Sequence, residues 1–325
     1  MTPRPNNVLI SSAGRRVSLL RAFEHAAAAL NPAIGVLACD ASPLSAALQS
    51  AKRGFVAPRC TDQLFIPWLA DLCTRERIGL IIPTIDTELP VLAAAKETLA
   101  AIGATVALSS AEVADIGGDK ARTHEWLVSM GFPTVRQYSR NSIPPGTEWP
   151  LLAKPRFGSA SIGIQRLADS TYLRMLGAET EYVLQEIAEG REHTVDVLVL
   201  GGTCVAAVPR ERLEVRAGEV SKGVTRRVPK LEALAVKIAE SLPGAFGTLN
   251  IQVFVDASGG MKVIEINPRF GGGFPLSFAA GANFPMWLMQ MVFGYPSSAS
   301  NSWRENLVML RYDDAVFVDE RALNS

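Results

Sequence analysis

Short apolar runs alternate with helical patterns over the first 108 residues, and this alternation constrains the fold more than any other feature. The predicted strands are residues 8–10, 34–40, 78–84 and 105–108. The predicted helices lie between them, at residues 16–30, 44–51, 64–75 and 88–101. Such alternation is typical of a parallel sheet with crossover helices. The sequence therefore predicts that the chain begins with a Rossmann-like α/β domain.

The turns of this predicted domain do not identify which ligand, if any, it binds. Residues 11–16 read SSAGRR and lack the G-x-G-x-x-G spacing of a dinucleotide site. Asp40 follows the second predicted strand, where a ribose-binding acid would lie, but a single acidic residue is weak evidence. Residues 84–88 follow another strand, at the edge where open α/β sheets bind ligands. Because they fit a helix cap equally well, both interpretations stay open.

The charge balance argues against a polyanionic partner. The chain has 325 residues, with 32 lysines and arginines against 32 aspartates and glutamates. A protein that binds nucleic acid or a membrane surface usually has a basic excess, so neither partner is expected. Hydrophobic residues make up 48% of the chain, which is enough for a sizeable core, and the length favours two or three lobes.

Several features favour a cytoplasmic location. The four cysteines are widely spaced and indicate neither a zinc site nor a disulfide framework. The N-terminal residues lack the apolar segment of a secretory signal. Residues 274–294 are uncharged and long enough to span a bilayer, but prolines and polar residues interrupt them. We expect a loop and a core helix there; an exposed homodimer interface is the alternative.

From about residue 111 the pattern changes to α+β. A helix is predicted at 119–130, and an irregular, proline-containing stretch follows at 141–150. Residues 151–163 then combine an apolar strand, which carries Lys154, with a loop of small residues. Free backbone amides beside an ammonium group suit nucleotide phosphates. A purely structural hairpin has the same local pattern.

A second candidate segment, residues 182–200, consists of two predicted strands around the turn QEIAEG. Main-chain groups in such a turn can meet the edge of an adenine, while a nearby carboxylate binds the ribose hydroxyls. An ordinary charged hairpin is the alternative interpretation.

Oxygen donors gather in residues 247–273. Glu265 and Asn267 project to one face of a predicted strand, and Gln252 lies opposite them if residues 256–260 form a hairpin turn. Such oxygen ligands suit Mg²⁺. A glutamate buried among apolar neighbours is expensive unless it is paired or bound to a metal. The sequence therefore predicts a magnesium site here.

Arg269 follows this predicted metal strand directly, and residues 271–273 are three consecutive glycines. An arginine beside a magnesium site can stabilise developing phosphoryl or oxyanion charge, and the glycines let the backbone approach a substrate closely. A surface arginine at a flexible turn is the alternative.

Together these motifs resemble the ATP-grasp superfamily, in particular the short proteins related to the large chain of carbamoyl phosphate synthetase. The resemblance rests on VLISSAGRR, GDKARTHEWLVSMGFPTV, AKPRFGSASIG, LQEIAEGREHTVDVL and VIEINPRFGGG, in this order. It implies a Rossmann-like domain at residues 1–110 and a two-lobed ATP-grasp fold. The small lobe is expected at residues 111–187 and the C-terminal lobe at 188–325.

The resemblance also implies roles for individual residues. Lys120 and Lys154 are expected to hold the nucleotide phosphates, and Ser159, Ala160 and Ser161 to lie in the loop that covers them. The adenine-binding hinge is expected at Glu186 and Ala188, and the ribose-binding acid at Glu192. The expected magnesium ligands are Gln252, Glu265 and Asn267. Arg269 is expected to steady the transferred phosphate.

The implied activity is an ATP-dependent ligation with Mg²⁺ or Mn²⁺, in which a small-molecule carboxylate becomes an acyl phosphate and an amine attacks it. Cations at Arg210, Arg212, Arg216 and Lys222 are candidates for substrate binding, as is Gly272, although a solvated charged turn explains those cations equally well. Two alternatives are a carbamoyl phosphate synthetase-like enzyme that phosphorylates bicarbonate or carbamate, and an inactive nucleotide-binding module. Intact Lys154, Glu265, Asn267 and Arg269 argue against the inactive module.

Overall fold

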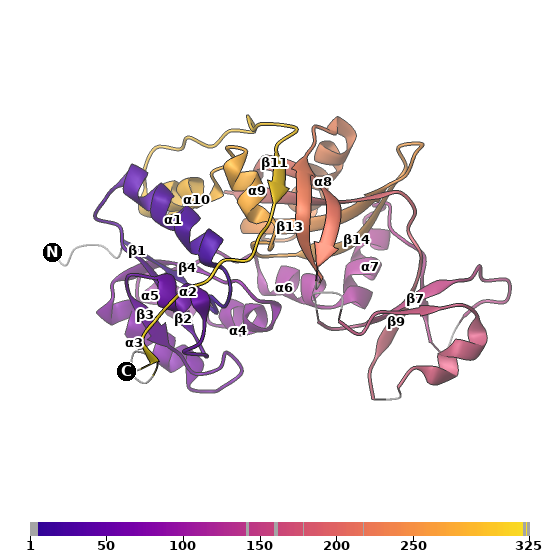
Figure 1. Cartoon of the computed structure of the whole chain (residues 1–325), viewed down its shortest axis with the longest axis horizontal. Coiled ribbons are helices and arrows are strands. Elements are labelled where there is room, and N and C mark those ends of the chain that lie inside the picture. The colour runs from indigo at the N-terminus through magenta and orange to yellow at the C-terminus, as the bar shows by residue number, and fades with distance from the viewer. Residues whose placement is uncertain are drawn as a thin grey trace.

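The computed structural model describes residues 6–140, 143–158, 162–177, 179–216, 218–320 and 323. Within these residues the strands form three sheets. Figure 1 shows the N-terminal α/β domain at one end, a large antiparallel sheet in the middle and a small sheet that projects at the other end. The predicted combination of an α/β domain with a two-lobed α+β region is therefore confirmed.

The N-terminal sheet is parallel, with strand order β3-β2-β1-β4-β5. Its strands are β1 (Asn7–Ile10), β2 (Val36–Asp40), β3 (Gly54–Val56), β4 (Ile78–Ile82) and β5 (Thr105–Val106). Its helices are α1 (Val17–Leu30), α2 (Ala46–Ser50), α3 (Phe65–Arg75), α4 (Leu89–Ala94) and α5 (Lys96–Ala101).

Two details of this domain differ from the prediction. The sequence analysis missed β3, whose three residues are too few, and too exposed, to show an apolar pattern. The predicted helix at 88–101 is divided at Ala95, where the backbone leaves the helical region with φ −95° and ψ 1°. A short 3-10 turn, Asp86–Glu88, precedes α4.

The uncharged segment at 274–294 forms α9 (Phe274–Ala279) and α10 (Phe284–Phe293). Both helices pack against α1, and Phe274, Phe284 and Leu288 belong to a core that also contains residues of β1 and β2. Figure 1 shows α1 and α10 side by side. The expected core helix is confirmed, and this shared core joins the two ends of the chain. None of the helices in the described ranges is long and apolar enough to cross a membrane.

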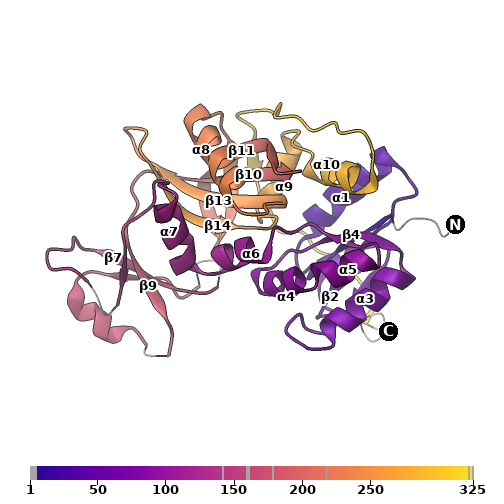
Figure 2. The same ribbon diagram turned by 180° about the vertical axis from the view of Figure 1, so that it is seen from behind.

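The large sheet has the order β14-β13-β10-β11-β12-β15. Its strands are β10 (Arg191–Leu200), β11 (Thr203–Arg216), β12 (Glu219–Thr225), β13 (Gly247–Val255), β14 (Met261–Asn267) and β15 (Val308–Leu310). One face is covered by α8 (Pro229–Ser241) and by α6 (Ala111–Gly118) and α7 (Lys120–Ser129), as the view from behind shows (Figure 2). Asp119 caps α7 by accepting a hydrogen bond from the backbone of Ala121.

The small sheet has the order β6-β9-β7-β8. Its strands are β6 (Gln137–Ser139), β7 (Leu151–Pro155), β8 (Gln165–Leu167) and β9 (Tyr182–Glu186), and a 3-10 segment, Ser170–Met175, lies beside them. Its own core is small, with Leu151, Leu167 and Leu184 at the centre. Our division of the chain at residues 110 and 187 stays a proposal; α6 and α7 pack on the large sheet rather than on the small one.

Candidate functional site

A cavity of about 320 Å³ lies between the small and the large sheet. The small sheet contributes β7 and β9, and the large sheet contributes β10, β11, β13 and β14. Much of the lining is apolar, and Phe157 and Ile162 remain 58% and 78% exposed although they lie at its edge. Exposed apolar side chains around a concave site are typical of ligand binding, since solvent contact with them is unfavourable.

The predicted phosphate-binding lysines both line this cavity. Lys120, at the start of α7, donates from Nζ to the carbonyl oxygen of Gly158 at 2.7 Å. Burial lowers the pKa of Lys154, the carboxylate of Glu265 opposes that effect, and Lys120 adds to it. The two ammonium groups are thus close enough to repel one another, which favours an anion between them. Ser159, Ala160 and Ser161 lie outside the described residues.

The predicted adenine hinge and ribose-binding acid also line the cavity, but the carboxylates of Glu186 and Glu192 already form ion pairs. Glu186 accepts hydrogen bonds from Arg136 Nε at 2.8 Å and from Lys262 Nζ at 2.6 Å. Although burial opposes it, these bonds hold the pKa of Glu186 below its usual value. Glu192, the expected ribose-binding acid, forms an ion pair with Arg212. Ala188 lies in the wall, as the hinge prediction requires.

Two buried polar atoms in this wall have no hydrogen-bond partner. Across the described part of the chain, three buried side-chain atoms lack one: Gln185 Oε1, Arg212 Nε and Thr248 Oγ1. The first two belong to residues that line the cavity. An unsatisfied buried donor or acceptor costs about 1–3 kcal/mol. A ligand with both hydrogen-bond donors and acceptors would satisfy them.

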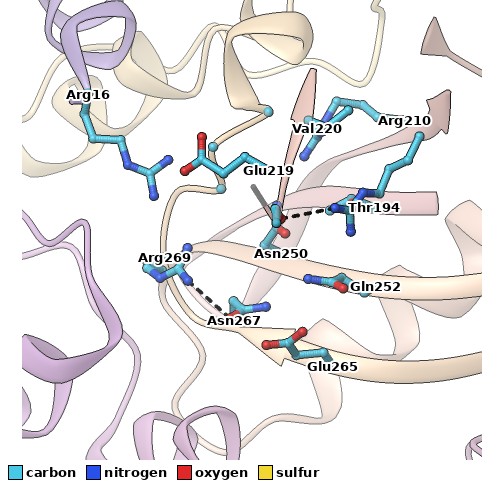
Figure 3. Close-up of a pocket in the computed structure, with 15 residues that line it drawn as sticks. Arg16, Thr194, Arg210, Glu219, Val220, Asn250, Gln252, Glu265, Asn267 and Arg269 are labelled. Carbon is cyan, nitrogen blue, oxygen red and sulfur yellow. Dashed lines mark hydrogen bonds between the residues drawn. The ribbon is translucent and has the colours of Figure 1, made fainter. Parts of the chain in front are cut away.

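A second, smaller cavity of about 150 Å³ adjoins the first (Figure 3). Arg212, Gln252 and Glu265 line both cavities. The second cavity is also lined by the N-terminal domain through Arg16 and by the glycines 271–273. Two of the predicted magnesium ligands, Gln252 and Glu265, therefore lie where the two cavities meet, and the third, Asn267, lines the second cavity only.

The hairpin expected around residues 256–260 is present, and β13 and β14 pair in antiparallel register. Gln252 lies opposite Glu265, and Asn250 lies opposite Asn267. Figure 3 shows the side chains of Gln252, Glu265 and Asn267 on neighbouring strands at one end of the cavity. One expectation was wrong: Glu265 is only half-buried, because its side chain faces the joined cavities instead of the core.

Arg269 is held by the N-terminal domain. Its Nε and Nη2 donate to the two carboxylate oxygens of Asp86 at 2.6 and 2.7 Å. Burial alone would lower the pKa of Arg269, but the Asp86 carboxylate raises it above its ordinary value. Asp86 belongs to the turn for which ligand binding and helix capping were both considered. The structure gives Asp86 a further role, which is to orient an arginine 183 residues away.

The three glycines after Arg269 pack against neighbouring side chains. A Cβ atom at Gly271 would clash with the amide of Asn250, and one at Gly273 would clash with the guanidinium of Arg210. A Cβ at Gly272 would lie 3.0 Å from the carboxyl carbon of Glu219. All three glycines line the second cavity, and the expected approach of a substrate to their backbone stays a prediction. Because these glycines have no Cβ atom, the side chains of Asn250, Glu219 and Arg210 have room to surround the second cavity.

The predicted substrate-binding cations separate into two groups. Arg210 lines the second cavity but is 2% exposed, and its Nε and Nη2 donate to Asp196 at 2.7 and 2.9 Å. Lys222 and Arg216 lie on the exposed side of β12 and β11, where they pair with Glu214 and Asp313. Neither lines either cavity, so a role for them in binding a substrate there was a wrong expectation.

Arg210 and Lys222 are expected to differ sharply in how much their replacement lowers the stability of the fold. Replacing Arg210 with Met should lower the free energy of unfolding by about 3–5 kcal/mol, because it leaves the buried Asp196 carboxylate uncompensated. The Lys222→Met variant removes a pair that is half exposed on both sides and should cost less than about 1 kcal/mol. Chemical denaturation of both variants would test this, and equal losses would contradict the assignment of Arg210 to a buried structural pair.

Several residues that line the two cavities were not predicted as site residues, among them three with polar or charged side chains. Arg16 and Glu219 line the second cavity, and Gln185 lines the first. Arg16 was considered only as part of a turn without dinucleotide spacing. The available signal for Gln185 was its position in a buried strand, where an amide side chain needs partners.

Comparison with known proteins gives two family matches. Residues 8–107 match the family described as PylC-like, N-terminal domain. Residues 178–315 match the family described as ATP-grasp in the biosynthetic pathway with Ter operon. Mouse carnosine synthase 1 is 29% identical over 150 residues, a segment that covers 38% of this chain and only 18% of that protein.

Solved structures share the fold over nearly the whole chain. The biotin carboxylase domain of Hydrogenobacter thermophilus 2-oxoglutarate carboxylase has a TM-score of 0.73 and 18% identity, over 93% of this chain and 73% of that one. The N5-carboxyaminoimidazole ribonucleotide synthetase of Thermotoga maritima has a TM-score of 0.67 and 20% identity, over 91% and 78%. The L-amino acid ligase of Bacillus licheniformis has a TM-score of 0.65 and 17% identity, over 90% and 75%.

At these identities the structural likeness establishes the fold, and the family matches add the type of each domain. Residues 8–107 therefore match a PylC-like N-terminal domain, and residues 178–315, which follow it, match an ATP-grasp domain.

Proposed function

We propose that this protein is an ATP-dependent ligase that joins a small-molecule carboxylate to an amine, with ADP and phosphate as products. The observation that carries the proposal is the pair of joined cavities, which meet at Gln252 and Glu265. The larger, partly apolar cavity suits a nucleotide, and the smaller, polar one suits an acid. A γ-phosphoryl group at the junction would lie between the two substrates.

The larger cavity has the groups that ATP requires. Its apolar walls suit a purine ring, and the unpartnered Gln185 Oε1 is positioned to accept a hydrogen bond from an exocyclic amino group. Lys120 and Lys154 supply positive charge at the other end for the phosphates. Glu192 lines the same cavity, and its carboxylate oxygen that does not pair with Arg212 would accept hydrogen bonds from the ribose hydroxyls. The name of the Bacillus licheniformis L-amino acid ligase states a ligase activity, which agrees with this assignment.

The residues at the junction fit Mg²⁺ or Mn²⁺. Glu265 offers a carboxylate with no hydrogen bond or ion pair to another described residue, and Gln252 and Asn267 offer amide oxygens. Within the described ranges no cluster of three or more acidic, histidine or cysteine side chains surrounds a metal position. This donor set suits an ion held mainly by phosphate oxygens, and the ion would neutralise their charge. The related Hydrogenobacter structure is described as a complex with MgADP.

The proposed reaction needs positioning and charge rather than a protein nucleophile. A carboxylate oxygen of the acid attacks the γ-phosphorus, an O–P bond forms, and the bond to ADP breaks. The amine then attacks the acyl carbon, loses a proton, and releases inorganic phosphate. Lys154 and Arg269 hold the transferring group, and among the described lining residues there is no cysteine or histidine.

The proposal can be tested with purified protein, ATP, Mg²⁺ and pools of carboxylic acids and amines. We expect ADP and phosphate to form only when both an acid and an amine are present, with a new mass equal to their sum less water. Formation of AMP would contradict the acyl-phosphate route. ADP formation with bicarbonate alone would favour the carbamoyl phosphate synthetase-like alternative, and nucleotide binding without turnover in any pool would favour an inactive module.

A Lys154→Met variant should bind ADP–Mg at least tenfold more weakly than the wild type. The substitution keeps the length of the side chain but removes a half-buried ammonium group from the nucleotide cavity. Calorimetric titration with ADP and Mg²⁺ measures the change. Lys230→Met, which removes an exposed ammonium group at the start of α8, is the matched control and should bind as the wild type does. Unchanged binding by Lys154→Met would contradict the phosphate role of this lysine.

The remaining assignments of partners and place are also proposals. The substrates are a small carboxylate and an amine, with no nucleic acid or membrane partner, in the cytoplasm. The four cysteines are free thiols in the structure, with Cys39 and Cys73 buried. Most of the segment considered as a homodimer interface is buried within the chain, so a homodimer would have to use another surface.

A further inference from the structure

One arginine of the second cavity forms no side-chain hydrogen bond and no ion pair with any residue that the structure describes. Four arginines line this cavity, and three of them form ion pairs: Arg210 with Asp196, Arg212 with Glu192 and Arg269 with Asp86. Arg16, which lies at the N-cap of α1, makes no side-chain hydrogen bond and no ion pair with the rest of the described chain. Figure 3 shows its guanidinium pointing from the N-terminal domain into the cavity.

The carboxylate whose charge acts most strongly on Arg16, that of Glu219, is also bound by another arginine. Glu219 faces Arg16 across the cavity in Figure 3, yet its Oε2 accepts from Arg311 Nη1 at 3.0 Å. Gly272 leaves the space in which this carboxylate lies. Burial and the neighbouring Arg269 lower the pKa of Arg16 to about 10, although the carboxylates of Glu219 and Asp86 act in the opposite direction, and the group is still charged at neutral pH. A desolvated guanidinium without a partner is unfavourable, and a bound anion would relieve the cost.

Arg16 is separated from the proposed reaction centre by Arg269. The charge of Arg269 acts on Arg16 and also interacts with Glu265. In Figure 3, Arg269 lies between Arg16 and Asn267. A single carboxylate at the junction of the cavities therefore leaves Arg16 unused. Two acidic groups on one molecule would reach both positions.

We propose that Arg16 binds a second carboxylate of the acid substrate, so that the substrate of this enzyme is a small dicarboxylic acid. This inference rests on the proposed ligase function. The cavity of about 150 Å³ is smaller than the sites that hold drug-sized ligands, which limits the acid to a short carbon chain. The planar guanidinium matches a carboxylate with two parallel hydrogen bonds.

The test compares dicarboxylic acids from malonate to adipate with monocarboxylic acids of the same chain length. Each is added to the full chain in the presence of ADP and Mg²⁺, and the shift in thermal unfolding is measured together with ADP formation from ATP and an amine pool. A ligand that binds only the folded state raises its stability in proportion to the logarithm of its concentration. We expect at least one dicarboxylate to bind at least tenfold more tightly than its monocarboxylate counterpart.

Arg16→Met should abolish this preference and leave ADP binding unchanged, because Arg16 does not line the nucleotide cavity. Arg16→Lys should retain part of the preference, since it keeps the charge but loses the paired donors, and it serves as a second variant if Arg16→Met does not fold. Arg21→Met removes an exposed charge from the same helix and should behave as the wild type.

The outcomes separate this inference from the proposed function. Turnover of monocarboxylates and dicarboxylates at equal rates, with Arg16→Met unaffected, would overturn the role of Arg16 and leave the ligase proposal standing. A dicarboxylate preference that depends on Arg16, without ADP formation in any pool, would support the binding site and reject the ligase. Absence of any dicarboxylate preference in the wild type would also overturn the inference.

Discussion

A Glu265→Gln variant is expected to lose about 100- to 1,000-fold in kcat, which is typical when one preorganised electrostatic group is removed from a reaction centre. Glu265 supplies the only carboxylate among the three proposed metal ligands, and it faces both cavities. The amide keeps its size but cannot offset the charge of a divalent ion. The fold should be unaffected, because no described residue depends on this carboxylate for a hydrogen bond.

The measurement is the rate of ADP formation as a function of Mg²⁺ concentration, with thermal unfolding as a check on folding. We expect a higher Mg²⁺ requirement as well as a lower maximal rate. Glu305→Gln removes an exposed carboxylate before β15 and is the matched control, with wild-type behaviour expected. A Glu265→Gln enzyme with a normal rate and an unchanged Mg²⁺ dependence would show that the metal is held elsewhere.

The second large effect is expected from Arg269→Lys, with a loss of about 100-fold in kcat. The pair with Asp86 uses two nitrogens of the guanidinium, and the amine of lysine cannot reproduce this fork. Binding of ADP–Mg should remain close to that of the wild type, since Arg269 lines the second, smaller cavity and not the first cavity, where we propose that the nucleotide binds. Single-turnover kinetics and calorimetry would separate the two effects.

Asp86 provides the test of how Arg269 is positioned. Asp86→Asn keeps the shape of the side chain but weakens the pair, so kcat should fall by about tenfold while KM for ATP stays unchanged. If Asp86 acts through Arg269, adding Asp86→Asn to the Arg269→Lys enzyme should cause little further loss. Fully additive losses would indicate that Asp86 contributes independently of this arginine.

The elements that local sequence patterns predict well are those with a strong period. Alternating side chains in residues 261–267 placed Glu265 and Asn267 on one face, and the hairpin register confirms that placement together with Gln252 opposite. The βα alternation of the N-terminal domain is confirmed for the same reason, because its strands are almost wholly apolar. β3 has no such pattern and was missed.

Charged residues were harder to interpret, because one side chain type serves several purposes. Arg210 and Lys222 belong to the same basic stretch, yet Arg210 is buried against Asp196 and Lys222 is paired at the surface. Asp196, a carboxylate within the apolar run TVDVLVL, was the signal that a buried partner was needed. The sequence does not reveal which of several nearby arginines supplies it, since that depends on the register of β10 and β11.

Chemistry within one strand or one turn can thus be read from residue order: the strand that delivers Lys154, the oxygen donors of β14 and the glycines that follow them. Contacts between domains cannot be read in this way, because they depend on how α1 packs against α10. This packing brings the turns after β1 and β4 to the end of β14. That packing pairs Asp86 with Arg269 and places Arg16 at the second cavity, where its side chain forms no hydrogen bond or ion pair with a described residue. The tertiary structure alone therefore decides which charged groups line the second cavity, and our proposals for the acid and for the charge that selects it depend on that arrangement.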